Sequence, residues 1–314
     1  MWCVLSGGVG GARFIDGLTS VLPPDEITVI GNTGDDIEFF GLHICPDIDI
    51  VLYTILGVVD EEKGWGLKGD TFKAESMLKA LGEDQWFHLG DGDLALSLYR
   101  TFRLGQGLSL TEVTREIASR LGAGVKILPA TDHRIETRVI TASGEDIHFE
   151  EYFVKRQCRD TVKAIRFDTP GCAVRATATG EVVEAIRSSE GVILAPSNPF
   201  VSIGCILAVE PIRDLLRRKD NGPVVAISPI VGGEAIKGPA ARMLAELGME
   251  PSALAVAQLY EDFLDGFVMD LKDETLKEPV ERLGIRCLLT DTIMRSRDAR
   301  AALARATLEF ARCL

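Results

Sequence analysis

Short apolar runs alternate with amphipathic stretches at both ends of the chain. At the N-terminus, the pattern predicts a strand over 2–5, a helix over about 11–21 and a strand over 27–30. Short continuous apolar strands between helices are typical of a parallel sheet covered on both faces. We therefore expect an α/β fold with a doubly wound, mainly parallel Rossmann-like sheet. The C-terminal part continues the alternation, with strands expected over 191–197, 223–231 and 284–291, and helices over 199–219 (with Pro211 as a potential interruption), 238–248 and 297–314.

The middle of the chain has a different pattern. Its segment 137–154 predicts a hairpin that turns at Ser143 and Gly144. Ser109 and Glu112 have the spacing of a capping box at the start of a helix. We expect a single unit over 1–314, in which a Rossmann-like core of about 1–40 and 186–314 carries an inserted α/β lobe of about 41–185. Helices of this lobe are expected over 46–59, 70–82 and 109–122.

Composition and charge limit the classes of partner that the protein is expected to bind. The chain has 314 residues and a formal net charge of −13, so it is poorly suited to broad binding of nucleic acid or acidic membranes. No apolar run reaches the roughly 18–20 residues that span a bilayer, and no secretory signal pattern precedes the first strand. Seven cysteines without a C-x-x-C pair favour a reduced compartment, with most of them buried. We expect a cytoplasmic protein with neither nucleic-acid nor membrane partners.

Four glycines lie between the first strand and the first helix. Gly7, Gly8, Gly10 and Gly11 allow sharp turns and close approach of a ligand, and the free N–H groups of a helix N-terminus favour an anion. The alternative is a tight strand–helix turn that binds nothing. Arg13 replaces the third glycine of the dinucleotide fingerprint, and no G-K-[ST] follows. The loop therefore favours a nucleotide diphosphate over a dinucleotide or a P-loop substrate, which leaves a dehydrogenase as a distant alternative.

Polar side chains gather just past the second strand. Asn32, Asp35, Asp36, Asp47 and Asp49 fall within eighteen residues. Ligands of doubly wound sheets bind beyond the carboxyl ends of the strands, and carboxylates beside a phosphate require a cation between them. Mg²⁺ takes one or two carboxylates together with phosphate oxygens. Turn and helix-capping roles are the alternative.

Four further groups of polar residues end strands or begin helices. Each could cap a helix or form a turn, but capping alone poorly explains three polar strand-end motifs in successive α/β units. They are Asp91 and Asp93; Thr131, Asp132 and His133; Ser197, Asn198 and Ser202; and Gly232, Gly233 and Lys237.

Taken together, these motifs resemble the 2-phospho-L-lactate transferase (CofD) family of coenzyme F420 biosynthesis. The resemblance runs along nearly the whole chain, in order and spacing. It is carried by SGGVGGAR, NTGDD, CPDIDIVLYTILG, GWG, DTF, LGDGDLAL, GEDIHFEEYFV, PSNPFVSIG, SPIVGGEAIKGPAA and LLTDTIM.

The resemblance implies a Mg²⁺-dependent transferase. Such enzymes move a phosphorylated three-carbon acid, lactyl or enolpyruvyl, from a guanosine-diphosphate-linked donor to the hydroxyl of the deazaflavin Fo, and release GMP. It also implies a homodimer. The residues expected to bind the donor are Gly7, Gly8, Gly10, Gly11, Arg13, Asn32, Ser197, Asn198, Gly232, Gly233 and Lys237. Those expected at the acceptor are Asp47, Asp91, Thr131, Asp132, His133 and Ser202, with Asp35, Asp36 and Asp91 catalytic and Asp35, Asp36 and Asp47 as metal ligands.

Four positions depart from the family pattern. Gly92 stands where arginine is usual, and His133 replaces an aspartate, both at motifs expected on the acceptor side. Cys45 and Cys205 replace serine and proline. The alternative function is a non-catalytic regulator that binds a nucleotide sugar, since a related branch of this fold resembles such proteins; the retained NTGDD and PSNPFVSIG motifs favour the transferase.

Overall fold

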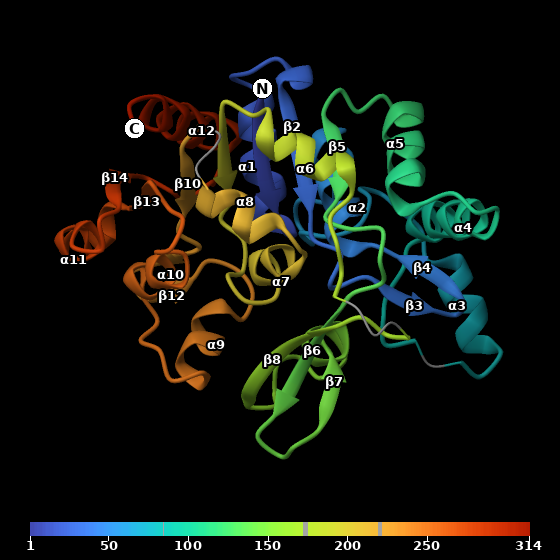
Figure 1. The fold of residues 1–314 in the computed structure, drawn as a ribbon. Coiled ribbons are helices and arrows are strands. Elements are labelled where there is room, and N and C mark those ends of the chain that lie inside the picture. The colour runs from blue at the N-terminus through green and yellow to red at the C-terminus, as the bar shows by residue number, and fades with distance from the viewer. Residues whose placement is uncertain (84, 172–174, 219–221) are drawn as a thin grey trace.

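A seven-stranded parallel sheet forms the centre of the molecule (Figure 1). The structure is a computed structural model and describes all residues except 84, 172–174 and 219–221. Within the described residues, every neighbouring pair of strands in this sheet is parallel, which confirms the expected fold class. In spatial order the strands are β14 (Arg286–Thr290), β13 (Gly266–Asp270), β10 (Val224–Ile227), β9 (Gly191–Leu194), β1 (Trp2–Ser6), β2 (Ile27–Gly31) and β5 (Lys126–Pro129).

Helices cover both faces of this sheet because its strands are apolar on both sides. In β1, Trp2 and Val4 pack into one hydrophobic cluster, while Cys3 and Leu5 pack into another. The first cluster contains α1 (Val9–Thr19), α2 (Pro46–Ile55), α5 (Leu110–Leu121) and α12 (Arg297–Arg312). The second contains α6 (Gly180–Arg187), α7 (Ile203–Ala208), α8 (Ile212–Arg218), α9 (Ala240–Glu246), α10 (Ala253–Leu259) and α11 (Lys277–Glu281).

A smaller antiparallel sheet lies below the central one in Figure 1. Its strands are β6 (Glu136–Thr141), β7 (Asp146–His148) and β8 (Val162–Asp168), and a π-helix over Glu151–Lys155 follows β7. The expected turn at 143–144 joins β6 to β7, so that prediction is confirmed. The residues after the hairpin form a helix rather than continuing the strand.

The range 41–185, expected as an insertion, divides into two parts. Its strand β5 pairs with β2 in the central sheet, so the lobe is interrupted by a core strand. The part before β5 contains α3 (Lys73–Ala80) and α4 (Asp91–Gly105), and it follows a hairpin of β3 (Ile37–Phe39) and β4 (Leu42–Ile44). The part after β5 is the smaller sheet.

Several elements differ from the expected ones for local reasons. The helix expected over 199–219 is two helices, α7 and α8, because Pro211 lacks an N–H group and lies between them. The strand expected over 223–231 divides at Ser228 and Pro229 into β10 and β11 (Ile230–Val231). The fully buried strand β13 was not anticipated, since its short apolar run is hidden between acidic segments.

The surface and the cysteines bear on the expected environment. No helix in the described part of the chain is long and apolar enough to cross a membrane. The six described cysteines are free thiols, three of them buried, and Cys172 lies outside the described residues.

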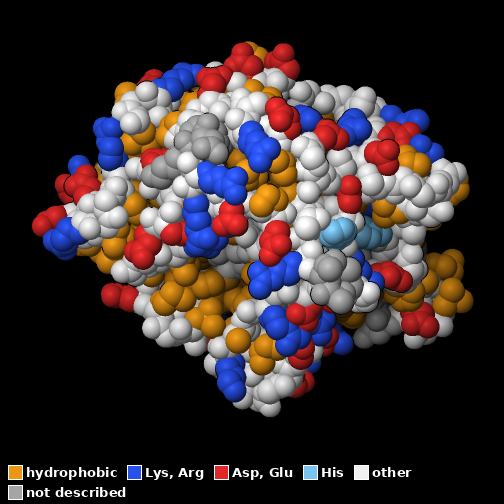
Figure 2. Space-filling view, viewed as in Figure 1, with side chains coloured by type: hydrophobic (Ala, Val, Ile, Leu, Met, Phe, Trp, Pro, Cys, Tyr) orange, Lys and Arg blue, Asp and Glu red, His pale blue; other side chains and the backbone are white. Residues whose placement is uncertain are grey.

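Figure 2 shows hydrophobic side chains gathered over the α3 region, where Met77 and Leu81 are exposed. The expected homodimer stays a prediction.

Candidate active site

A cavity of about 840 Å³ opens beyond the carboxyl ends of the central strands. Its walls come from the glycine loop after β1, the start of α2, the π-helix of the smaller sheet and the loop after β9. Two further loops, around 63–66 and 236–240, complete the rim. This is where doubly wound folds bind their ligands, because successive loops converge there.

The glycine loop provides both a helix N-terminus and close packing. Gly8 is the N-cap of α1, and Gly8 and Gly10 line the cavity. None of the four glycines has a positive φ, so left-handed turns do not explain them. A Cβ on Gly8 would lie 2.6 Å from Asp47 Oδ1, and a Cβ on Gly10 would overlap the Pro196 carbonyl. The glycines therefore allow α2 and the loop after β9 to approach the helix N-terminus.

Carboxyl groups are concentrated at the floor of the cavity. Asn32 Nδ2 donates to Asp35 Oδ2 at 3.0 Å and to Asp47 Oδ2 at 2.9 Å. Asn32 Oδ1 in turn accepts from the backbone of Gly34 at 2.9 Å, which fixes the amide. The third carboxyl, Glu150, is buried at the start of the π-helix and forms no side-chain hydrogen bond within the described residues. One amide thus holds two carboxylates together, with a third facing the same space.

Burial makes this cluster difficult to ionise in the metal-free protein. Burial, and secondarily the Asp47 and Glu150 charges, raises the pKa of Asp35 well above its usual range. Burial raises the pKa of Asp47 to about 7, opposed by the Asn32 hydrogen bond. Burial and the nearby Asp47 and Asp36 raise the pKa of Glu150 to about 8. Asp35 Oδ1 is buried without a hydrogen-bond partner in the described part of the chain. These groups fit a hard divalent cation, which prefers oxygen ligands.

The rim carries basic side chains. Arg13, Lys63, Lys237 and Arg295 line the cavity. Arg13 and Lys237 have no ion-pair partner among the described residues, and partial burial together with the Arg13 charge lowers the pKa of Lys237. Arg13, Lys237 and the N-terminus of α1 give this part of the cavity positive charge, with Glu61 near enough to interact with both side chains, although the chain as a whole is acidic.

Aromatic side chains form another part of the wall. Phe149 and Phe153 stack with ring centroids 5.6 Å apart and an interplanar angle of 8°, and Phe153 is 40% exposed. Phe87 and Trp65 also line the cavity. The cavity therefore combines a cationic region, a cluster of carboxyls and an apolar aromatic surface.

The structure brings nine of the residues predicted for the site to this cavity. Three more lie directly behind its walls: Gly7 donates its N–H to Ser197 Oγ at 3.0 Å, Gly11 packs against Ser6, and Asn32 orients the carboxylates. The nine that line the cavity are Gly8, Gly10, Arg13, Asp35, Asp47, Ser197, Asn198, Ser202 and Lys237.

The other residues to which a role was assigned do not line the cavity, whereas Asp49 and Asp93, which were candidates without an assigned role, do. Asp91 accepts hydrogen bonds from the Thr71 hydroxyl and from the N–H groups of Lys73 and Ala74 at the start of α3. Gly232 donates its N–H to Asp273 at 3.0 Å, and Gly233 lies beside it in the turn between β11 and β12 (Glu234–Ala235). These contacts are those of turns and helix ends, and the proposed substrate roles of these residues stay predictions.

The Thr-Asp-His segment also has local partners. Asp132 Oδ1 accepts from the N–H and hydroxyl of Thr111 at 2.7 Å, which anchors the first turn of α5. The Thr131 hydroxyl donates to the Thr177 carbonyl at 2.6 Å, and the Thr177 N–H donates to His133 Nδ1 at 3.2 Å. Asp36 also has local partners, because its Oδ2 lies within hydrogen-bonding distance of His43 Nε2 and accepts a hydrogen bond from the Cys45 thiol.

Lining residues that the sequence analysis missed include Lys63, Glu150, Phe153 and Arg295. Lys63 directly precedes the GWG motif, and Glu150 lies within the HFEEYFV motif, so both motifs contained a signal. Neither residue type indicates a site without the fold, because charged residues are common in surface loops.

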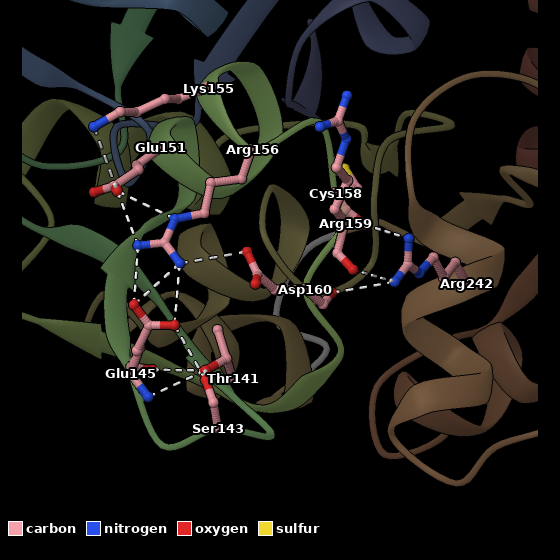
Figure 3. Close-up of polar contacts among 10 residues, drawn as sticks. All are labelled: Thr141, Ser143, Glu145, Glu151, Lys155, Arg156, Cys158, Arg159, Asp160 and Arg242. Carbon is pink, nitrogen blue, oxygen red and sulfur yellow. Dashed lines mark hydrogen bonds and ion pairs between the residues drawn. The ribbon is translucent and has the colours of Figure 1, made fainter.

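Arg242, an exposed arginine of α9, is hydrogen-bonded to the segment that follows the π-helix (Figure 3). Arg242 of α9 donates to the backbone carbonyls of Cys158, Arg159 and Asp160, the last two at 3.4 and 3.2 Å. Gln157 and Cys158 both have positive φ, an uncommon conformation that turns these carbonyls toward Arg242. The π-helix that carries Glu150 and Phe153 is thereby attached to the helix whose N-terminal loop carries Lys237.

Comparison with known proteins identifies the family. The model of the family described as 2-phospho-L-lactate transferase CofD matches residues 3–299. The chain belongs to the CofD family. A protein of Streptomyces griseus named phosphoenolpyruvate transferase is 46% identical over 98% of this chain and 97% of that one. A protein of Methanococcoides burtonii named 2-phospho-L-lactate transferase is 38% identical over 93% of this chain and 94% of that one.

Solved structures confirm the fold of this CofD-family transferase. A crystal structure of a UPF0052-family protein of Bacillus halodurans matches with a TM-score of 0.65 over 98% of both chains. Its sequence identity is 16%, so this match supports the architecture alone. The transferase class comes from the family and from relatives of both names.

Proposed function

We propose that this CofD-family enzyme transfers a phosphorylated three-carbon acid from a guanosine-diphosphate-linked donor to the hydroxyl of the deazaflavin Fo, and releases GMP. The observation that carries the proposal is the division of one cavity into a cationic region at a helix N-terminus, a carboxyl cluster and an aromatic wall. Each region suits one part of this reaction: an anionic donor, a metal-assisted phosphoryl centre and a flat acceptor.

The donor diphosphate belongs at the N-terminus of α1. Free N–H groups near Gly8 and the unpaired side chains of Arg13 and Lys237 supply positive charge there. Ser197 and Asn198 lie on the adjoining wall, where they can contact the nucleoside. Transfer of a phosphoryl group depends chiefly on positioning and charge neutralisation, and this region supplies both.

Asp35 and Asp47 are the residues that would hold Mg²⁺. Their oxygens suit this ion, Asn32 holds both carboxylates in place, and Asp35 Oδ1 has no hydrogen-bond partner within the described residues. When bound, Mg²⁺ supplies charge neutralisation at the phosphorus and on the departing GMP.

The acceptor belongs against Phe149 and Phe153, where a flat ring can stack. Glu150 lies between Phe149 and Phe153 in the sequence and lines the cavity. We therefore assign it the role of the base that accepts the proton of the acceptor hydroxyl. Its carboxylate, whose ionised form a cation held by the neighbouring carboxyl groups would favour, would accept that proton as the hydroxyl oxygen bonds to phosphorus and the bond to GMP breaks.

The three-carbon acid is proposed to be enolpyruvyl. Relatives named phosphoenolpyruvate transferase reach 46% identity, against 38% for relatives named 2-phospho-L-lactate transferase. Assays of the enzyme should include both donors.

The deciding experiment measures GMP release by the purified protein with Fo, Mg²⁺ and each donor. We expect GMP to form only when Fo, donor and Mg²⁺ are all present, with a new phosphodiester of Fo found by mass spectrometry. Titration of Fo fluorescence separately reports acceptor binding. Saturable binding of a UDP-sugar without GMP formation would instead support the nucleotide-sugar regulator.

Replacing Lys237 with methionine should weaken donor use. Methionine keeps most of the side-chain volume and removes the charge, and a charge-assisted hydrogen bond contributes about 1.5–3 kcal/mol. We therefore expect the donor KM to rise by roughly 10- to 100-fold, with a much smaller change in the acceptor KM. The exposed Lys163 on β8, changed to methionine, is the control. Equal effects on both substrates would contradict the assignment.

Replacing Arg242 with alanine should weaken binding of the acceptor and not of the donor. Without its hydrogen bonds to the carbonyls of 158–160, the turn after the π-helix loses a polar attachment to α9, while the apolar packing of Met243 with Phe149 and Tyr152 remains. We expect the acceptor KM to rise by about 10-fold and the protein to lose about 1–3 kcal/mol of stability. Steady-state kinetics with Fo varied, and thermal unfolding, measure these effects. Arg159 changed to alanine is the control, and an unchanged acceptor KM in the Arg242 variant would contradict the role.

A further inference from the structure

The β3–β4 hairpin brings together three side chains of the kinds that bind metals in proteins. Its register pairs Ile37 with Ile44 and Glu38 with His43, so continuing it by one pair sets Asp36 opposite Cys45. His43 and Cys45 are two residues apart in extended chain, so they share a face. Aspartate, histidine and cysteine thus meet at one end of the hairpin.

Distances agree with this placement. His43 Nε2 lies 3.1 Å from Asp36 Oδ2, and the Cys45 thiol donates to the same oxygen at 3.0 Å. One ligand atom from each residue lies within 4.8 Å of the other two. None of the three residues lines the cavity, so this cluster is separate from the Asp35 and Asp47 carboxylates.

One oxygen of this cluster is buried without a hydrogen-bond partner. The Asp36 side chain is 9% exposed, and its Oδ1 is buried without a hydrogen-bond partner among the described residues. The nearby Arg100 interacts electrostatically with Asp36, but its hydrogen bonds go to Asp49 and to the His43 carbonyl, so it leaves Asp36 Oδ1 without a hydrogen-bond partner. A buried carboxylate in this position is costly unless a cation compensates it.

Ligand chemistry distinguishes the site from one for Mg²⁺. Imidazole nitrogen and thiolate sulfur favour Zn²⁺ and neighbouring transition metals, whereas Mg²⁺ prefers oxygen alone. The His43 side chain is 32% exposed, which leaves an approach from solvent for the ion and for a water as fourth ligand. We propose that Asp36, His43 and Cys45 form a site for a divalent transition metal of the Zn²⁺ class, separate from the proposed Mg²⁺ site.

Binding there replaces the thiol–carboxylate hydrogen bond with bonds from all three side chains to the metal, and the thiol proton leaves to solvent. Asp36 adjoins Asp35 in sequence, and Cys45 lies two residues before Asp47. Metal binding would therefore fix the two segments from which the cavity carboxylates project.

Cobalt titration of the full-length apoprotein tests this proposal without any substrate. We expect one Co²⁺ per chain, a thiolate-to-cobalt charge-transfer band, visible bands of tetrahedral intensity, and displacement by Zn²⁺ but not by excess Mg²⁺. Cys45→Ser should abolish the charge-transfer band and weaken binding at least about 10-fold. His43→Gln should weaken binding to a similar degree and keep a thiolate band. Cys313→Ser, at an exposed cysteine, is the control.

Absence of a charge-transfer band in the unmodified protein, or its survival in Cys45→Ser, would overturn the proposal. Displacement by Mg²⁺ would also overturn it. If Cys45→Ser fails to fold, His43→Gln decides the question by the same titration. Because the readout is spectroscopic, failure of the transferase assay leaves this test unaffected.

Discussion

Replacing Asp47 with asparagine should lower kcat/KM by roughly 100- to 1,000-fold, as expected for loss of a group that organises transition-state electrostatics. The substitution keeps the size of the side chain beside Gly8 and an oxygen that can accept from Asn32 Nδ2. It removes the negative charge that would hold Mg²⁺, so binding of the metal should weaken while the fold remains.

Rate measurements over a range of Mg²⁺ concentrations check this result. The Asp47 variant should need more Mg²⁺ for half-maximal rate, whereas Fo binding by fluorescence should change little. Asp168→Asn, on the smaller sheet and outside the cavity, is a matched control. A variant with unchanged Mg²⁺ requirement and activity would remove Asp47 from the proposed metal site.

The position of Asp47 was predictable because it rests on topology. Loops after parallel strands converge at one edge of the sheet, so the glycine loop, Asp35, Asp47 and Ser197 were correctly expected to lie close together. The doubly wound sheet was predictable as well, since short apolar runs between helices indicate buried parallel strands. The strand β13 was not predicted because its three apolar side chains, Phe267 to Met269, lie between acidic segments and show little periodicity.

The acceptor-side predictions depended on side-chain partners, which the sequence does not show. Asp91 and Asp132 are each used at a helix start, and an aspartate before a helix has the same local pattern whether it caps the helix or faces a ligand. Glu150 and Phe153 reach the cavity through the π-helix segment, which apolar packing against Met243 and the hydrogen bonds of Arg242 hold to α9. Contacts between segments about 80 residues apart leave no local pattern in the chain.

Metal-free protein should become less stable as the pH rises from about 5 to about 8. Burial raises the pKa of Asp47 to about 7 and that of Glu150 to about 8, and it also raises the pKa of Asp35. In this window the folded protein holds protons that the unfolded chain has released. The free energy of unfolding therefore falls with increasing pH, by about 1.4 kcal/mol per pH unit for each retained proton, and the fall ends above the folded-state pKa values.

Mg²⁺ should reverse this loss, and more strongly at about pH 8 than at about pH 5, because a cation binds the ionised carboxylates and competes with protons. Thermal unfolding at several pH values, with Mg²⁺ or with a chelator, measures both effects. In Asp47→Asn one titrating group is gone, so the pH dependence of the metal-free protein should become shallower and Mg²⁺ should stabilise it less. If Mg²⁺ stabilised the unmodified protein equally at both pH values, the buried carboxyls would not be its ligands, since a site already ionised at the lower pH would have to hold it.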